Sequence, residues 1–275
     1  MQKIDRLGWA AGFCGESFGV RVGIRANTPQ ALEALRPLLP LDWRYTTRPV
    51  VDLLFSYVEA KPPSRPGLKR FSILYLAAGR LARTLAPQEI ASAFENGVQL
   101  WVAEAAPRHA FVHAGVVGWR DRAIVIPGSS LSGKSTLTAA LVRAGATYYS
   151  DEYAVVDSRG RVLPFARPLQ LRQPDGQPMR KVTAESLGGA TGEKSLHVGL
   201  VVETSYRPGY RWRPRRGTAG RGALALMSHA VPIQRRPAWT MKLLTRAAQT
   251  GGHLKGTRGE AEAVAERTLH EFADW

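Results

Sequence analysis

Cysteine is almost absent from this chain of 275 residues, because Cys14 is the only one. A lone cysteine excludes an internal disulfide framework and a structural zinc site built from cysteines. No uninterrupted apolar stretch approaches the length of a membrane span. The first residues also lack a secretory pattern, since their short apolar run contains glycine and is followed by Glu16. We therefore expect a cytoplasmic protein without a membrane partner.

Acidic residues are missing from residues 205–259, which contain 12 Lys or Arg and no Asp or Glu. The net charge of +16 is therefore unevenly distributed along the chain. Within this segment, residues 207–216 alternate arginine with tyrosine and tryptophan. Three roles fit such a stretch: binding the bases and phosphates of a nucleic acid, guiding an acidic peptide, or forming a solvated loop. No recognised nucleic-acid motif accompanies it, which disfavours nucleic acid as the partner.

The motif G-x-x-x-x-G-K-[ST] is matched at every fixed position by residues 128–135. Its glycines allow a tight turn that brings backbone N–H groups close to phosphate oxygens. Lys134 supplies a cation for the outer phosphates, and the Ser135 hydroxyl can hold Mg²⁺. The motif predicts ATP binding. The expected nucleotide-binding residues are Gly128, Ser129, Ser130, Leu131, Ser132, Gly133, Lys134, Ser135 and Thr136.

The residues around the motif predict a strand, the loop and then a helix, which is the setting that docks phosphates on a helix N-terminus. An apolar run at 110–119, a short polar turn and a second run at 123–126 predict a β-hairpin that leads into the loop. If Trp119 faces Ala123, His113 faces Ser129 of the loop. The pattern therefore places a histidine beside the phosphates.

Two acidic residues follow the next predicted strand, at 146–150. Strands joined through a helix usually lie parallel in one sheet, so Asp151 should emerge at the same edge as the loop. Asp151 could bind magnesium or accept the proton of the acceptor hydroxyl. We expect Asp151, His113 and Lys134 to be the catalytic residues. Ser135, Asp151 and Glu152 are the expected magnesium ligands.

The chain reads as two regions of an α/β protein. Residues 1–108 predict a smaller α+β region, with strands at 18–24, 50–58, 71–77 and 80–85 and helices at 29–39 and 87–105. Residues 109–275 contain the loop motif and predict the catalytic domain. A further hairpin is expected at 155–163 and a final amphipathic helix from Glu260.

The block from His113 through 128–135 to Asp151 and Glu152 resembles the catalytic domain of the HPr kinase/phosphorylase family. The resemblance implies a mixed-sheet P-loop kinase core, with His113 supporting the active site and Asp151 as general base. The family usually has two aspartates where this chain has Asp151 and Glu152. The glycine-rich stretch with an additional magnesium-binding glutamate is not found, which favours a kinase-only relative. Small kinases that modify serine on ribosomally made peptides, lasso-peptide precursors among them, are similar in length and layout.

The resemblance predicts an ATP- and Mg²⁺-dependent kinase that transfers the γ-phosphate to a serine hydroxyl of a protein or peptide. The family is similar to phosphoenolpyruvate carboxykinases in its P-loop core, so a small-molecule kinase is one alternative. A nucleotide-binding regulator without turnover is another. Asp151 and His113 argue against the regulator, because a protein that only binds ATP needs neither. The sequence is compatible with a homo-oligomer.

Overall fold

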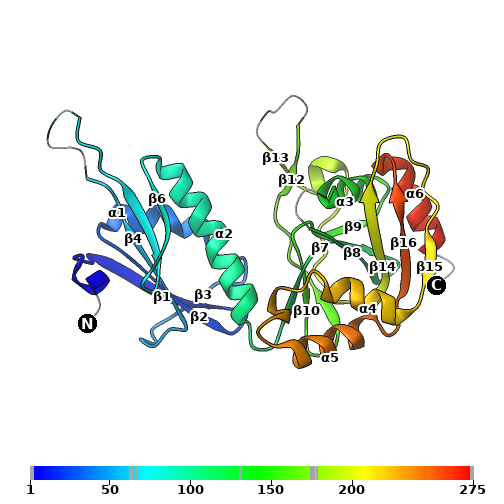
Figure 1. Cartoon of the computed structure of the whole chain (residues 1–275), viewed down its shortest axis with the longest axis horizontal. Helices are drawn as coiled ribbons and strands as arrows, with labels where there is room; N and C mark the ends of the chain where they lie inside the picture. The colour runs from blue at the N-terminus through cyan, green and yellow to red at the C-terminus, as the bar shows by residue number, and fades with distance from the viewer. Residues whose placement is uncertain are drawn as a thin grey trace. The chain divides into compact units, whose positions relative to one another are not determined.

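The computed structural model describes residues 3–61, 65, 67–129, 132–173, 177 and 179–272 (Figure 1). The chain divides into two compact units, Met1–Arg108 and His109–Trp275. Both units combine helices with a mixed sheet of parallel and antiparallel strands. None of the described helices is long and apolar enough to cross a membrane.

The first unit contains a six-stranded sheet in the order β3-β1-β2-β4-β5-β6. Strands β2 and β4 run parallel, and the other neighbours are antiparallel. The strands are β1 Ala11–Ser17, β2 Val20–Ala26, β3 Arg44–Thr46, β4 Leu53–Val58, β5 Ser72–Leu76 and β6 Gly79–Thr84. The helices are α1 Pro29–Leu35 and α2 Pro87–Ala105, and 3-10 turns occupy Lys3–Arg6 and Arg36–Leu38.

Helix α2 has the bounds that the sequence predicts, 87–105. It buries Phe94 and other apolar side chains one or two turns apart, and the Phe94 ring meets that of Phe55 at 5.4 Å. Strand β1 was not predicted, because Gly12 and Gly15 interrupt its pattern. A Cβ at Gly15 would lie 2.2 Å from the ring of Trp43, so the glycine makes room for this ring.

The second unit contains an eight-stranded sheet with the path β11-β10-β7-β8-β14-β16-β15, and β9 also pairs with β7. Strands β12 and β13 form a separate pair. The strands are β7 Ala110–Trp119, β8 Arg122–Pro127, β9 Thr147–Ser150, β10 Tyr153–Val156, β11 Arg161–Leu163, β12 Leu169–Leu171, β13 Arg180–Val182, β14 Leu196–Tyr206, β15 Arg215–Gly217 and β16 Gly252–Arg258. The helices are α3 Lys134–Arg143, α4 Ala219–Met227, α5 Pro237–Ala248 and α6 Ala261–Glu271, with 3-10 turns at Glu185–Leu187 and Val231–Ile233.

Helices cover both faces of this sheet (Figure 1). Ile124 and Ile126 of β8 pack in the cluster that contains α3 and α6 side chains. Ala123 and Val125, which point the other way, pack in the cluster that contains α4 and α5 side chains. A strand that is buried on both faces needs a continuous apolar run, which is why β8 lacks the alternation of a half-exposed strand.

The hairpin of β7 and β8 forms, but the predicted register is wrong by one residue. Gly118 faces Ala123, and the N–H of Gly128 donates to the carbonyl of His113 at 3.1 Å. His113 is therefore level with Gly128 and not with Ser129. The physical reason is a two-residue turn in which Arg120 and Asp121 both have positive φ, as a type I′ turn requires.

The acidic pair lies in a break between two strands that both pair with β7. Ser150 at the end of β9 faces Val116, and Tyr153 at the start of β10 faces His113. The N–H of Ala114 donates to the carbonyl of Glu152 at 3.2 Å, and Ala114 also faces Pro127 at the end of β8. The break is therefore level with the start of the glycine-rich loop. Such irregularities in a strand often redirect side chains at functional sites.

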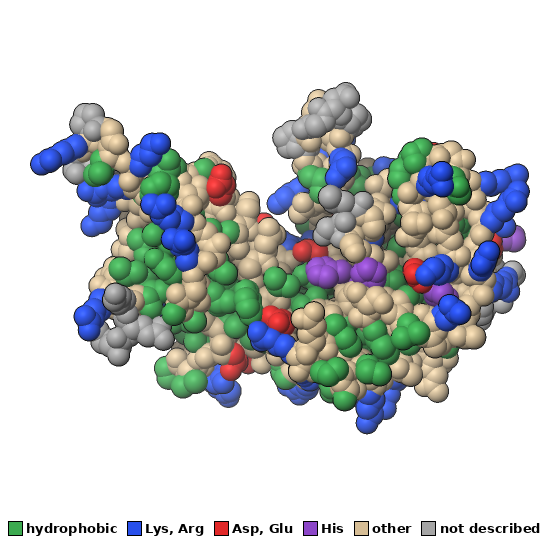
Figure 2. Space-filling view, viewed as in Figure 1, with side chains coloured by type: hydrophobic (Ala, Val, Ile, Leu, Met, Phe, Trp, Pro, Cys, Tyr) green, Lys and Arg blue, Asp and Glu red, His purple; other side chains and the backbone are tan. Residues whose placement is uncertain are grey.

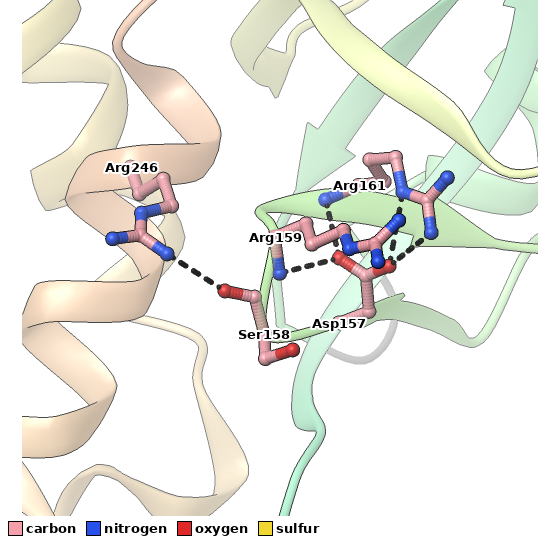
Figure 3. Close-up of polar contacts among 5 residues, drawn as sticks. All are labelled: Asp157, Ser158, Arg159, Arg161 and Arg246. Carbon is pink, nitrogen blue, oxygen red and sulfur yellow. Dashed lines mark hydrogen bonds and ion pairs between the residues drawn. The ribbon is translucent and has the colours of Figure 1, made fainter.

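The predicted hairpin at 155–163 is formed by β10 and β11, and Asp157 holds its turn (Figure 3). The Asp157 carboxylate accepts from the backbone N–H groups of Arg159 and Arg161 and from the Arg161 guanidinium, each at 2.9 to 3.1 Å. Arg246 of α5 donates to the carbonyl of Ser158 at 3.0 Å. These contacts fasten the turn to a helix that covers the sheet.

Candidate active site

The glycine-rich loop has its glycines where a side chain would not fit. A Cβ at Gly128 would lie 2.7 Å from Oγ of Ser132. Gly133 has φ +83°, and a Cβ there would contact Nη2 of Arg258, whose guanidinium is held by hydrogen bonds. Gly133 is therefore required by its left-handed backbone and by this neighbour, whereas a side chain at Gly128 would have to displace the Ser132 hydroxyl. The predicted site residues Ser130 and Leu131 lie outside the described residues.

Helix α3 begins at Lys134, directly after Gly133, which offers no side chain to cap the helix. The first N–H groups of a helix have no partner within it, so this end attracts an anion. The Lys134 ammonium donates to the carbonyl of Ser129 at 2.6 Å, which holds it against the loop. Burial lowers the pKa of Lys134, while the charges of Asp151 and Glu152 oppose this shift. The structure therefore brings the cation, both acids and the helix terminus together.

Asp151 is held in place by two donors. The Tyr148 hydroxyl lies 3.0 Å from one carboxylate oxygen and 2.7 Å from the Arg167 carbonyl, and its one proton is shared between these two acceptors. The N–H of Gln170, in β12, donates to the other oxygen at 3.3 Å. Burial first, and then the charge of Asp151, raise the pKa of the Tyr148 hydroxyl, which stays protonated and continues to donate. Asp151 is thereby oriented while its oxygens keep further acceptor capacity.

Glu152 has a different environment. Its carboxylate forms an ion pair with the Arg167 guanidinium at 3.6 Å, with side-chain exposures of 40% and 23%. Ser150 accepts the N–H of Glu152 at 3.2 Å, which fixes the backbone of the acidic pair. The two adjacent acids therefore have different neighbours: Asp151 accepts hydrogen bonds from uncharged donors, and Glu152 is paired with a cation.

A second histidine, His229, accompanies His113 and was not predicted. The carbonyl of His229 accepts the N–H of His113 at 2.9 Å. Burial first, and then the charge of Lys134, lower the pKa of both imidazoles. Histidine and acidic side chains gather on this face of the second unit (Figure 2). Both imidazoles are therefore uncharged near neutral pH and able to accept a hydrogen bond.

Arg258 is a second residue that sequence reasoning missed. Its side chain is only 2% exposed and donates to the carbonyl of Gly133 at 2.9 Å and to Oγ1 of Thr204 at 3.2 Å. It also donates to the carbonyl of Gly259 at 3.0 Å. Three donations from one rigid guanidinium fasten the end of the loop to the ends of β14 and β16.

A hollow of about 230 Å³ lies beside the start of α3. Its polar groups and one exposed aromatic ring fit a nucleoside next to phosphates at the helix terminus. Four of its residues are predicted nucleotide-binding residues, and the others come from three later segments. The lining residues are Gly133, Lys134, Ser135, Thr136, Gln170, Arg172, Met179 and Tyr206.

No group of three or more His, Cys, Asp or Glu side chains that could hold a metal ion occurs among the described residues. Magnesium in a nucleotide site requires only one or two carboxylates, because phosphates and waters supply the other oxygens. The donors near the loop are the Ser135 hydroxyl and the carboxylates of Asp151 and Glu152. This oxygen set fits magnesium and does not fit a structural zinc ion.

One signal in the sequence could have revealed a further acid of the site. Strand β14 is parallel to β8, so it ends at the same edge of the sheet. Its apolar run at 198–202 is followed by Glu203, in the way that 146–150 is followed by Asp151. The charge of Glu203 acts on His229, as does that of Lys134. For His229 itself we find no comparable local signal.

No family model matches the chain, and no curated protein matches it. Among solved structures, the chain is similar to one titled "Structure of the Hpr(Ser) kinase/phosphatase from Coxiella burnetii". The two share 12% identity over 60% of this chain and 95% of that chain, with a TM-score of 0.31. A similarity of this strength does not assign a family.

Proposed function

We propose that the protein is an ATP- and Mg²⁺-dependent kinase that transfers the γ-phosphate to a serine hydroxyl of a protein or peptide. The proposal depends on one observation. A glycine-rich loop, a lysine at a helix N-terminus and an oriented carboxylate, Asp151, share one site, and the charge of Asp151 acts on Lys134. Phosphoryl transfer needs a phosphate cradle together with a group that orients or deprotonates the acceptor.

In the proposed reaction, the loop N–H groups and Lys134 hold the β- and γ-phosphates. Asp151 accepts the proton of the serine hydroxyl as its oxygen bonds to the γ-phosphorus. The bond from that phosphorus to the bridging oxygen breaks, and ADP leaves. Mg²⁺, held by Ser135 and the acidic pair, would neutralise charge on the phosphates. His113 and His229 border Lys134, and His113 assists in positioning the acceptor.

The test is nucleotide binding by the Lys134→Ala variant. We expect Mg-ATP affinity to fall by at least tenfold with an unchanged circular dichroism spectrum, because Lys134 is only half-buried and belongs to neither hydrophobic cluster of the second unit. Calorimetric titration measures the affinity. The control is Lys194→Ala, which removes an exposed lysine far from the loop in sequence. Equal affinity for Mg-ATP in Lys134→Ala and wild type would refute the proposal.

A further inference from the structure

A second and larger hollow, of about 660 Å³, lies where β14, β16 and the arginine-rich segment meet. We call it the basic cleft. The end of β14 separates it from the nucleotide hollow: Tyr206 lines the latter, and Glu203 and Ser205 line the basic cleft. Its lining residues are Glu203, Thr204, Ser205, Tyr210, Arg211, Arg213, Arg215, Lys255, Gly256 and Thr257.

Three guanidinium groups of the basic cleft have no acid beside them. Arg211, Arg213 and Arg215 are exposed, and none forms an ion pair within the described part of the chain. Lys255 differs, because its ammonium donates to Glu203 at 2.5 Å. No Asp or Glu occurs anywhere in 205–259 to neutralise the three arginines. The cleft therefore presents a positive charge that suits a carboxylate-bearing ligand.

The inner end of the cleft, where Glu203 lies, is formed by the end of β14. This strand end borders both hollows, since Ser205 lines the cleft and the next residue, Tyr206, lines the nucleotide hollow. Arg215 faces Lys255 on the next strand, and Lys255 faces Glu203 on the strand after that. Arg215 therefore lies two strand spacings, roughly 10 Å, from Glu203 across the cleft.

The arginine-rich segment offers the cleft one exposed ring, Tyr210, and not the row of rings on which successive bases stack. Trp212 is 4% exposed and packs in the core with α3 and α6 side chains. The guanidinium of Arg207 lies 4.5 Å from the centroid of the Tyr210 ring. Binding of single-stranded nucleic acid depends on exposed rings for stacking. These features favour a peptide over nucleic acid.

We infer that the basic cleft binds an acidic segment of the acceptor peptide. The inference rests on the proposed kinase function and names its substrate class. Arg211, Arg213 and Arg215 bind the carboxylates and position the serine beside Asp151. Selectivity for acidic acceptors then comes from this cleft and not from the nucleotide hollow.

The test measures binding of a fluorescein-labelled peptide, Ser-Gly-Gly-Glu-Glu-Glu-Glu, to the full chain by anisotropy. The variant Arg211→Gln/Arg213→Gln/Arg215→Gln should bind it about tenfold more weakly, and added salt should reduce the difference. A matched control, Arg159→Gln/Lys194→Gln/Lys242→Gln, removes three exposed charges outside the cleft and should bind as wild type does. Mg-ATP affinity should remain unchanged in both variants.

Two outcomes would overturn the inference. One is equal binding of a peptide with Gln in place of Glu, or equal loss of binding in the control variant. The other is tighter binding of a thymidine oligonucleotide that the cleft substitutions abolish, which would assign the cleft to nucleic acid. If the acidic peptide binds but Mg-ATP does not, the kinase proposal fails by itself. If Mg-ATP binds and the acidic peptide does not, only the cleft inference fails.

Discussion

At the scale of single residues, the proposed reaction depends on the oxygen atoms of Asp151. The Tyr148 hydroxyl and the Gln170 N–H fix the carboxylate without neutralising its charge. Glu152, one residue further on, is paired with Arg167. A general base must be oriented and still able to accept a proton, and the structure provides this combination at Asp151.

Asp151→Asn is expected to retain Mg-ATP affinity and to lose phosphoryl transfer by about 10²–10⁴-fold, because the amide keeps the shape and cannot accept the proton. Transfer from radiolabelled ATP to a serine peptide measures the rate, and calorimetry measures the affinity. Glu152→Gln is the matched comparison and should lose less, since its carboxylate is paired with Arg167. Transfer at the wild-type rate by Asp151→Asn would remove this residue from the role of base.

At the scale of elements, the junction of loop and helix α3 depends on glycine at position 133. The left-handed backbone of Gly133 and the contact with Arg258 both exclude a side chain there. Gly188 offers a control, because its φ is +80° and no atom lies within 4 Å of a Cβ built on it. Alanine at either position therefore has the same cost of a left-handed backbone, but only at position 133 would its Cβ contact another side chain, that of Arg258.

We expect Gly188→Ala to lower the free energy of unfolding by about 1 kcal/mol and to leave nucleotide affinity unchanged. Gly133→Ala should cost more, since the added methyl group displaces Arg258, and it should weaken Mg-ATP binding by more than tenfold. Urea unfolding and calorimetric titration give the two quantities. Equal effects of the two substitutions on nucleotide affinity would show that Arg258 does not hold the loop.

The turn between β10 and β11 predicts how stability depends on pH. Burial opposes ionisation of Asp157, but the hydrogen bonds from the Arg161 backbone and side chain and from the Arg159 N–H outweigh it and lower the pKa of this carboxyl. A lowered pKa in the folded state contributes stability above the unfolded pKa, about 3.9, and loses it as the pH falls through the folded value.

Asp157→Asn is therefore expected to lower the free energy of unfolding by about 1–2 kcal/mol at pH 7, with a smaller difference from wild type near pH 3. Urea unfolding at several pH values measures the difference. Asp121→Asn is the control, because Asp121 is exposed and asparagine tolerates its positive φ. A difference that stays constant from pH 7 to pH 3 would contradict the assignment of the stability to the ionised carboxylate.

At the scale of the whole molecule, every residue of the candidate site belongs to the unit His109–Trp275. The first unit has its own sheet and its own buried residues, such as Phe55 and Phe94. A unit with a separate hydrophobic core can fold alone. We therefore propose two domains with the boundary after residue 108, and we assign nucleotide binding to the second.

Residues 109–275 produced alone are expected to fold and to bind Mg-ATP within about threefold of the full chain, because no site residue lies before 109. Circular dichroism and calorimetric titration test both statements. A folded fragment that does not bind Mg-ATP would show that the first unit contributes to the nucleotide site. An unfolded fragment would contradict the proposed boundary.

The sequence by itself determined the elements whose pattern is local. Helix α2, strand β7 and the predicted hairpin at 155–163 follow from apolar periodicity and turn residues within short windows. The glycine-rich loop could be predicted because its motif is also local: a tight turn limits which residues fit at each position. The register of β7 and β8 could not be predicted, because Arg120-Asp121 is not a residue pair typical of a turn with two positive φ angles.

The tertiary structure decided which distant residues surround the loop. Arg258 reaches the carbonyl of Gly133 because β14 runs parallel to β8, and β16 runs parallel to β14. His229 reaches His113 through a backbone hydrogen bond that joins residues more than one hundred positions apart. Such contacts depend on strand order and on packing of the whole sheet. The local sequence encodes neither the strand order nor the packing of the sheet, because chain entropy and burial select both only when the entire unit folds.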